Sequence, residues 1–444
     1  MGRWLVVLVI VLAGCDRVLG LDRPCNDRFG GDCATCGQIG QSCCAGEIAC
    51  GDGLFCGDGT CSECVTDVAL GRRHMCSLRY DGTVWCSGQN ESAQLGQPMS
   101  ALRTTEPIEV QGPFDHDVIS IGSGRSHVCA VRRDGTVWCW GHRSQGQLGD
   151  GIVNSESGVS TPVQVTKVDK SPLTGIKAVT AGYCNTCAVD TAGGGWCWGC
   201  DDTGELGDGV TVRRARAAPV LSRASEPFTD IAEITVGHQH SCLRTNAGAA
   251  WCWGEDLEGQ VGNGVSPAGN LTTFEVLPVK ILDDVRSIAA GSDFTCASLT
   301  DGTARCWGNA SGDRLGNGEE ADPADKYSPE LVVEQLGGPA FTHVTQVSVG
   351  AVGCVLSEDS ALWCWGKNSY GTTGGGGSLV PAPVISQDAK QLVGADRLRG
   401  HYAHTCAHLV DGRFVCWGRN TSGELANGTF IHTNTPAVVK LTCP

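Results

Sequence analysis

Residues 127–141 read His-Val-Cys-Ala-Val-Arg-Arg-Asp-Gly-Thr-Val-Trp-Cys-Trp-Gly, and this stretch decides the fold. Two runs of alternating apolar residues flank Asp134 and Gly135, which is the pattern of a β-hairpin. Cys129 and Cys139 lie ten residues apart, so the hairpin is symmetric about Asp134 and needs a loop with an odd number of residues. The commonest such loop is a type I turn followed by a left-handed residue, which predicts a positive φ at Gly135.

The same hairpin recurs seven times after residue 65, about every 52 to 58 residues. The turn glycine is replaced once, by Ser360, and is otherwise kept at Gly82, Gly135, Gly193, Gly248, Gly302 and Gly412. Each hairpin has two cysteines ten residues apart: Cys76 and Cys86, Cys129 and Cys139, Cys187 and Cys197, Cys242 and Cys252, Cys296 and Cys306, Cys354 and Cys364, Cys406 and Cys416.

Counting outward from the turn places each cysteine couple on a non-hydrogen-bonded pair, where Cα atoms approach to about 4.5 Å. A disulfide tolerates that separation, so we predict one in every hairpin. Cys184 and Cys200 share the midpoint of Cys187 and Cys197. They predict a second disulfide in that hairpin, on a hydrogen-bonded pair.

Further strands flank each hairpin. An apolar strand that ends at glycine precedes it, as in residues 118–121. A Gly-x-Leu-Gly-x-Gly loop follows it, as in residues 146–151, and leads to a strand that we expect to begin at proline, as at Pro162. Four short strands per repeat and seven repeats predict an all-β, seven-bladed β-propeller, with each sheet packed on its neighbours around an axis.

These repeats resemble the regulator of chromosome condensation (RCC) repeat family. The family pattern His-Ser/Thr-x-Ala-Leu-x-x-Asp-Gly-x-Val-x-x-Trp-Gly, followed by Gly-Gln-Leu-Gly, is matched over residues 65–444. Repeat six departs most, with Gly353 where histidine is expected, and repeat seven has Ala426 for a loop glycine. The resemblance implies a seven-bladed propeller. The family's namesake exchanges guanine nucleotide on a small GTPase, and a secreted bacterial protein of this fold group inhibits β-lactamase.

The N-terminus predicts export. Residues 1–14 have the pattern of a signal peptide, because the apolar run from Trp4 to Ala13 is too short to span a bilayer. The end of this run, Leu-Ala-Gly before Cys15, resembles the bacterial lipobox, which implies cleavage before Cys15 and a lipid on that residue. We therefore expect the protein in the bacterial cell envelope, bound to a membrane through Cys15. An ordinary secretory signal with an incidental cysteine is the alternative.

Residues 15–64 predict a small module held by disulfides, since they have nine cysteines after Cys15 and almost no apolar core. Nine is an odd number, and Cys443 is the remaining unassigned cysteine. We predict a disulfide from Cys443 to this module, with Cys61 or Cys64 as its partner, that closes the propeller ring. A free or intermolecularly paired Cys443 is the alternative. Zinc ligation is a further alternative for the module, although export favours oxidation.

Charge and motif content limit the function classes. A net charge of −16 disfavours nucleic-acid partners. Histidines recur at one repeat position, but Asn185, Phe294 and Gly353 interrupt the series, so we expect these positions to serve packing or hydrogen bonding. No repeat has a distinctive acid, base and nucleophile cluster, and we expect no catalytic residues, metal or cofactor. The tryptophans that flank the second cysteine of each hairpin predict packing between blades.

The leading hypothesis is a non-catalytic binding propeller in the envelope that recognises a protein or a glycan through its rim loops. The candidate loops contain residues 154–160 and 319–327, with Asn154, Glu156, Glu319, Asp322 and Tyr327 as candidate contacts. Exchange activity by family analogy, a surface enzyme of unknown reaction and a purely structural envelope component are the alternatives.

Overall fold

The computed structural model describes residues 54–57, 60–99, 102–153, 158–223, 225–266, 273–319 and 325–440. The chain divides into two compact units, one made of residues 65–410 and 414–440 and the other of residues 1–64, 411–413 and 441–444. In the second of these, β1 (Leu54–Gly57) pairs antiparallel with β2 (Thr60–Glu63). Within the described ranges we find no helix with the length and apolar character of a membrane span.

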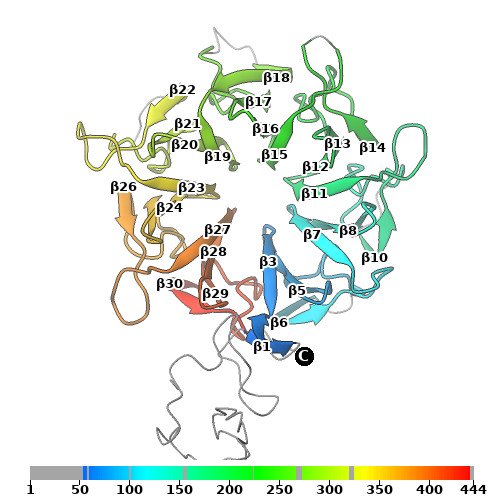
Figure 1. The fold of residues 1–444 in the computed structure, drawn as a ribbon, viewed down its shortest axis with the longest axis horizontal. Coiled ribbons are helices and arrows are strands. Elements are labelled where there is room, and N and C mark those ends of the chain that lie inside the picture. Colours follow the sequence, from blue (N-terminus) through cyan, green and yellow to red (C-terminus); the bar gives the residue numbers. More distant parts are fainter. Residues whose placement is uncertain are drawn as a thin grey trace, which may run out of the picture. The chain divides into compact units, whose positions relative to one another are not determined.

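Residues 65–440 form a seven-bladed β-propeller of four-stranded antiparallel sheets (Figure 1), as the repeats predict. Blade one contains β3 (Val65–Leu70), β4 (His74–Arg79), β5 (Val84–Gln89) and β6 (Arg103–Glu109). Blade two contains β7 (Val118–Ser123), β8 (His127–Arg132), β9 (Val137–Gly141) and β10 (Val159–Gln164). Blade three contains β11 (Ile176–Ala181), β12 (Asn185–Asp190), β13 (Gly195–Gly199) and β14 (Arg214–Pro219). Blade four contains β15 (Ile231–Val236), β16 (His240–Thr245), β17 (Ala250–Glu255) and β18 (Phe274–Leu282). Blade five contains β19 (Val285–Ala290), β20 (Phe294–Leu299), β21 (Ala304–Gly308) and β22 (Lys326–Leu331). Blade six contains β23 (Val344–Val349), β24 (Gly353–Ser357), β25 (Leu362–Gly366) and β26 (Ser378–Pro383). Blade seven contains β27 (Ala395–His401), β28 (His404–Leu409), β29 (Phe414–Gly418) and β30 (Thr433–Val438).

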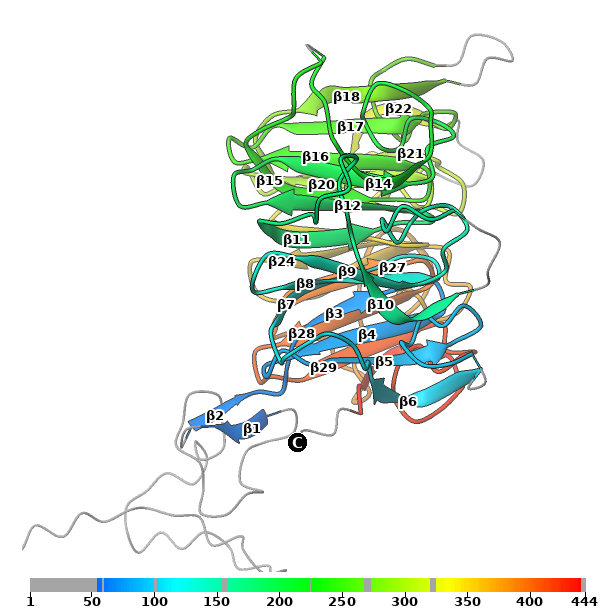
Figure 2. The same cartoon turned by 90° about the vertical axis from the view of Figure 1, so that its right-hand side faces the viewer.

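The first strand of every blade lies innermost (Figure 1), and these strands line a central channel of about 350 Å³. The loops of the propeller extend from the two ends of its strands (Figure 2). Each blade is one continuous segment of chain, because its four strands follow one another in sequence order.

The hairpins have the predicted three-residue turn. In blade two, Arg132 donates its backbone N–H to the carbonyl of Thr136 at 2.9 Å, and Gly135 donates to the carbonyl of Arg132 at 2.8 Å. Gly135 has a φ of 79°, and Ser360 takes the same left-handed conformation with a φ of 62°. The turn is therefore kept where glycine is not.

Disulfides join the cysteine couple of every blade, with Cα–Cα distances of 4.1 to 4.2 Å. The additional disulfide, Cys184–Cys200, has a Cα–Cα distance of 5.5 Å and lies on a hydrogen-bonded pair, since Cys200 donates its N–H to the carbonyl of Cys184. Cys64 is also disulfide-bonded. The lipidation at Cys15 and the disulfide from Cys443 lie outside the described residues.

Two expectations about the repeats are wrong. The fourth strand does not begin at proline: β10 begins at Val159, and Pro162 lies at a shift of register inside it, where its missing N–H takes no ladder bond away. In repeat six, the residue that stands at the histidine position is Val352. Gly353 pairs with Trp365, just as Thr295 pairs with Trp307 in repeat five. Gly353 therefore occupies the serine or threonine position of the motif, and the loop before this hairpin is one residue shorter.

Tryptophans hold neighbouring blades together. The tryptophan after the second cysteine is fully buried in six blades, and its indole N–H donates to a loop carbonyl of the preceding blade, at 2.7 to 3.0 Å: Trp140 to Gln94, Trp198 to Gln147, Trp253 to Glu205, Trp307 to Gln260, Trp365 to Arg314 and Trp417 to Thr372. The tryptophan before that cysteine, such as Trp138, is only half-buried. Packing between blades is thus confirmed for the first set.

The boundary between blade seven and blade one differs from the others. Blade one has Ser87 at the position of the buried tryptophan, and Met75 where Thr186 and Thr295 bond to a histidine. Contacts at β3 replace these bonds: Arg397 donates to the carbonyl of Thr66, and Arg399 pairs with Asp67 at 3.3 Å. Within the described residues, side-chain contacts and not a shared sheet close the ring.

Candidate functional site

The propeller has two faces with different loops. In each blade the loop between the first and second strands and the loop between the third and fourth strands leave from the same end, because the strands are antiparallel. We call this side the loop face. The three-residue turns and the connections from blade to blade lie on the opposite side, the turn face.

Two of the residues predicted to bind a ligand have structural contacts on the loop face. Glu319 pairs with Lys326 at 3.0 Å within the loop of blade five. Tyr327 donates its hydroxyl to the carbonyl of Leu257 at 3.1 Å, so it joins blade five to blade four. Asn154, Glu156 and Asp322 lie outside the described residues.

A pocket of about 440 Å³ lies elsewhere on this face, and we call it the arginine pocket. Its lining comes from loops of the first three blades: Arg72, Arg73, Gln89, Glu91, Ser92, Arg125, Ser126, His142, Gln145, Gln147, Tyr183 and Cys184. None of these residues was predicted as a contact from the sequence. The sequence did contain a signal for this pocket, which is arginine directly after the loop glycine. Arg72 and Arg73 follow this glycine in blade one, and Arg125 follows it in blade two.

Glycines let the loops of neighbouring blades interlock beneath this pocket. A Cβ on Gly124 would collide with the carbonyl oxygen of Gly182, and Arg125 donates its backbone N–H to that oxygen at 2.9 Å. His238 makes the equivalent bond to Gly291 at 3.1 Å. The side chain that follows each glycine is therefore placed by the backbone of the next blade.

Side chains from these loops form a chain of contacts across the loop face. The guanidinium carbon of Arg125 lies 4.3 Å from the ring centroid of Tyr183, within cation–π range. The ring of Tyr183 contacts that of His238 edge-on at 4.1 Å, and His238 lies 4.0 Å from Asp293. These four residues belong to four successive blades, so the contacts cross three blade boundaries.

The three arginines of the pocket form no salt bridge with a described residue, although the carboxylate residue Glu91 is among the residues that line it. Among the described residues, no carboxylate lies within salt-bridge distance of Arg72, Arg73 or Arg125. Burial and the positive charges of Arg72 and Arg73 lower the pKa of Arg125. The three guanidinium groups therefore repel one another in a chain whose net charge is −16.

Other polar atoms at the pocket also have no partner. The Nε of Arg73 and the Oε1 of Gln145 are buried without a hydrogen bond inside the protein. Gln147, in contrast, is engaged, since its side-chain amide donates to Nδ1 of His142 at 2.9 Å. Burial, followed by the charge of Arg125, lowers the pKa of His142, so this ring is neutral at pH 7.

The additional disulfide lies beside this pocket. Cys184 follows Tyr183 in the loop of blade three and is bonded to Cys200 at the end of β13. The bond restrains the loop that presents the tyrosine ring, which favours a pocket of fixed shape.

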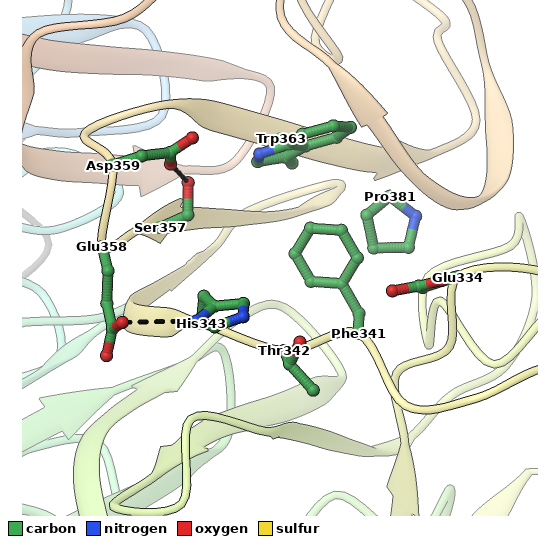
Figure 3. Close-up of a pocket in the computed structure, with 9 residues that line it drawn as sticks. All are labelled: Glu334, Phe341, Thr342, His343, Ser357, Glu358, Asp359, Trp363 and Pro381. Atoms are coloured by element: carbon green, nitrogen blue, oxygen red, sulfur yellow. Dashed lines mark hydrogen bonds and ion pairs between the residues drawn. The ribbon is translucent and has the colours of Figure 1, made fainter.

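A second pocket, of about 700 Å³, lies on the turn face between blades five and six. Figure 3 shows Phe341, Pro381 and Trp363 on one side of it and Glu358 and Asp359 on the other. The rings of Phe341 and Trp363 meet nearly edge-on at 5.3 Å. The same contact recurs two repeats earlier, between Phe228 and Trp251 at 5.3 Å, which indicates a packing role for the aromatic pair.

Two of the three carboxylates that line this second pocket are engaged in local contacts. Glu358 lies 3.3 Å from His343 and 3.9 Å from Arg286. Asp359 accepts the hydroxyl of Ser357 at 2.5 Å, and this bond lowers the pKa of Asp359. Each of these two carboxylates therefore has a local partner that accounts for its position.

The recurring histidines serve the blade boundaries. His127 bonds to Thr186 at 2.8 Å and His240 bonds to Thr295 at 2.8 Å, each across a boundary. Burial lowers the pKa of both rings to about 3, so they are neutral under physiological conditions. Among the described residues we find no group of three or more potential metal ligands.

The amino-acid sequence is similar to those of known proteins. A model of the RCC1-like domain family matches residues 33–356. The human E3 ubiquitin-protein ligase HERC2 is 27% identical over 86% of this chain, which corresponds to only 8% of the ligase. The Arabidopsis thaliana ultraviolet-B receptor UVR8 is 25% identical over 84% of this chain and 81% of the receptor.

Solved structures share the fold. Yeast RCC1 (Prp20), in its complex with Kap60, has a TM-score of 0.66 and 20% identity, over 85% of each chain. Human WBSCR16 has a TM-score of 0.65 and 21% identity, over 81% of this chain and 94% of that one.

Proposed function

Because the chain belongs to the RCC1-like domain family, we propose that it is a non-catalytic binding propeller, anchored in the bacterial cell envelope, that recognises a protein or glycan partner through its loop face. The observation that carries this proposal is the arginine pocket, where Arg72, Arg73 and Arg125 form no salt bridge with any described carboxylate. Yeast RCC1 forms a complex with the protein Kap60, which supports partner binding by propellers of this fold.

Rigidity supports a binding role. Each blade has its own disulfide, and blade three has a second one beside the pocket. A surface that is ordered before it meets its partner loses little conformational entropy on association. The loops that line the pocket are held by backbone bonds to the next blade, such as that from Arg125 to Gly182.

Nucleotide exchange and catalysis are weaker alternatives. Exchange activity rests on the family's namesake alone, and a shared fold does not transfer an activity. Two of the three carboxylates of the turn-face pocket, Glu358 and Asp359, are engaged by His343 and Ser357.

Envelope anchoring is proposed from Cys15 and the apolar run before it. The test is metabolic labelling with a clickable fatty acid, followed by membrane fractionation. The wild-type chain should be labelled and should sediment with membranes, whereas Cys15→Ala should lose both properties. A labelled Cys15→Ala chain, or an unlabelled wild-type chain, would contradict lipidation at this residue.

The partner is sought by crosslinking the full-length chain in intact envelopes and identifying what is captured. Hydrogen exchange on the purified complex then maps the footprint. We expect protection of loop-face segments such as residues 72–73 and 125–126. A footprint confined to the turn face would refute the proposed function.

A further inference from the structure

We infer that the arginine pocket binds a carboxylate side chain of an acidic polypeptide segment, with the guanidinium groups of Arg72, Arg73 and Arg125 as its donors. This inference rests on the proposed function, since it names the partner chemistry of the same face. It specifies one subsite of about 440 Å³, which is the size of a pocket for one or two residues.

The first argument is the charge of the pocket. Placing three guanidinium groups where they repel one another costs free energy, and burial and the charges of Arg72 and Arg73 lower the pKa of Arg125 accordingly. A carboxylate would relieve this repulsion. Guanidinium groups present planar pairs of N–H donors that match a carboxylate, and such charge-assisted bonds are stronger than neutral ones.

The second argument is the geometry of the donors. Arg125 is held over the ring of Tyr183 at 4.3 Å, and its backbone is bonded to Gly182 at 2.9 Å. The ring of Tyr183 is in turn contacted by that of His238, and Tyr183 directly precedes Cys184, which is bonded to Cys200. The donors are therefore placed before the ligand arrives.

The third argument distinguishes a polypeptide from an acidic glycan. A sugar ring would need an open aromatic face for stacking, whereas the ring of Tyr183 already contacts Arg125 and His238. The buried Oε1 of Gln145 has no donor inside the protein, and a backbone N–H of a polypeptide beside the bound carboxylate would supply one.

A long polyanion such as a nucleic acid is disfavoured by the rest of the molecule. The chain has a net charge of −16, so a polyanion that extends far beyond the pocket is repelled by the rest of the molecule, whereas a short acidic peptide keeps its charge close to the arginines. A single carboxylate inside the pocket contacts the local arginines, and more distant charges are screened over about 8 Å at physiological ionic strength.

The test is isothermal titration calorimetry on the full-length chain, with a capped hexaglutamate peptide as the probe and capped hexaglutamine as the neutral control. The pocket variant is Arg72→Gln with Arg125→Gln. The matched control is Arg133→Gln with Arg223→Gln, which removes the same charge from exposed positions on the turn face. A charge-preserving variant, Arg72→Lys with Arg125→Lys, keeps the positive charge but loses the planar donors.

We expect the wild-type chain and the matched control to bind hexaglutamate equally, and the pocket variant to bind it roughly 10- to 100-fold more weakly, as the loss of charge-assisted bonds implies. The lysine variant should fall between them. Folding of each variant is checked by intrinsic tryptophan fluorescence and by the absence of free thiols.

Equal affinity of the pocket variant and the matched control would overturn the inference, as would absence of hexaglutamate binding. Binding of trigalacturonate without hexaglutamate would assign the pocket to an acidic glycan and overturn it too. These outcomes differ from a failure of the proposed function. If a captured partner keeps its loop-face footprint on the Arg72→Gln, Arg125→Gln variant, the carboxylate subsite alone is refuted. A footprint on the turn face would instead refute the proposed function.

Discussion

Trp198 donates the N–H of its indole ring to the backbone carbonyl of Gln147, 2.9 Å away in the preceding blade. The same carbonyl accepts the hydroxyl of Thr186 at 3.2 Å, and that hydroxyl bonds to His127 at 2.8 Å. All of these groups are buried. The carbonyl of Gln147 thus accepts a hydrogen bond from the buried tryptophan ring and another from the threonine that bonds to His127.

We predict that Trp198→Ala lowers the free energy of unfolding by about 3–5 kcal/mol, the usual cost of removing a buried aromatic ring. The expected cause is a cavity at the blade boundary together with the lost bond to Gln147. Urea unfolding of the oxidised protein, followed by fluorescence, measures the change. Trp138→Ala is the matched control, since Trp138 is half-buried and bonds to Thr136 in its own blade. Equal losses for the two variants would contradict the assigned role.

The boundary between blades seven and one should open first. It has Ser87 and Met75 in place of the bonding tryptophan and threonine, and both ring nitrogens of His404 are buried without a partner. Hydrogen exchange should therefore be faster in β3 and β27 than in β15, because blade four is joined to both neighbouring blades by a buried tryptophan bond.

A variant sharpens that prediction. Arg399→Ala removes the pair with Asp67 and should raise exchange in β3 and β27 without changing that in β15. The effect on global stability should be small, about 0–1 kcal/mol, because both side chains are partly exposed. Protection of β3 equal to that of β15 in the wild-type protein would refute a weak boundary.

Asp256 should make the protein less stable as the pH rises. Burial, and then the charge of Glu275, raise the pKa of Asp256 to about 7, above the value of 3.8 expected in the unfolded chain. The folded state therefore binds the proton more tightly, and stability falls between about pH 4 and pH 7. Oδ1 accepts the N–H of Val261 at 3.0 Å, and Oδ2 is buried without a partner.

The substitution Asp256→Asn should thus raise Tm at pH 8 and leave it nearly unchanged at pH 4.5, measured by scanning calorimetry. Asn90, at the same position in blade one, shows that asparagine fits there: its oxygen accepts Leu95 and its amide donates to Gln97 and Pro98. The reciprocal Asn90→Asp should lose stability at pH 8. A Tm gain from Asp256→Asn that is equal at both pH values would exclude titration as the cause.

Removal of the Cys184–Cys200 disulfide should loosen the loop that presents Tyr183. We expect Cys184→Ala with Cys200→Ala to raise hydrogen exchange at residues 182–184 while β12 and β13 remain protected. The chain-entropy cost is below about 3 kcal/mol, because Cys187–Cys197 already closes part of the same loop. Unchanged exchange at residues 182–184 would show that the bond to β13 is not what restrains this loop.

The blade was predictable from sequence because its determinants are local. The spacing of Cys129 and Cys139 sets the register of one hairpin, and the turn residues Asp134 and Gly135 set its loop. The strand starts were not predictable in the same way, because a bulge at Pro162 changes the pairing without changing the motif. The histidine position of repeat six, in contrast, follows from counting two residues back from Cys354 to Val352.

The sequence by itself determined seven hairpins and the pairing of their cysteines, since both depend on residues within one repeat. Only the tertiary structure decided what the repeats build together. Arg73 and Arg125 are 52 positions apart in the chain and belong to different blades, yet loops that interlock at Gly124 and Gly182 bring them and Tyr183 to one pocket. Glu319 and Tyr327, in contrast, have structural roles. Glu319 pairs with a lysine of its own blade, and Tyr327 bonds to the neighbouring blade. A binding surface on a propeller is assembled across blades by the rotation from one repeat to the next, and no pattern within a single repeat specifies that rotation.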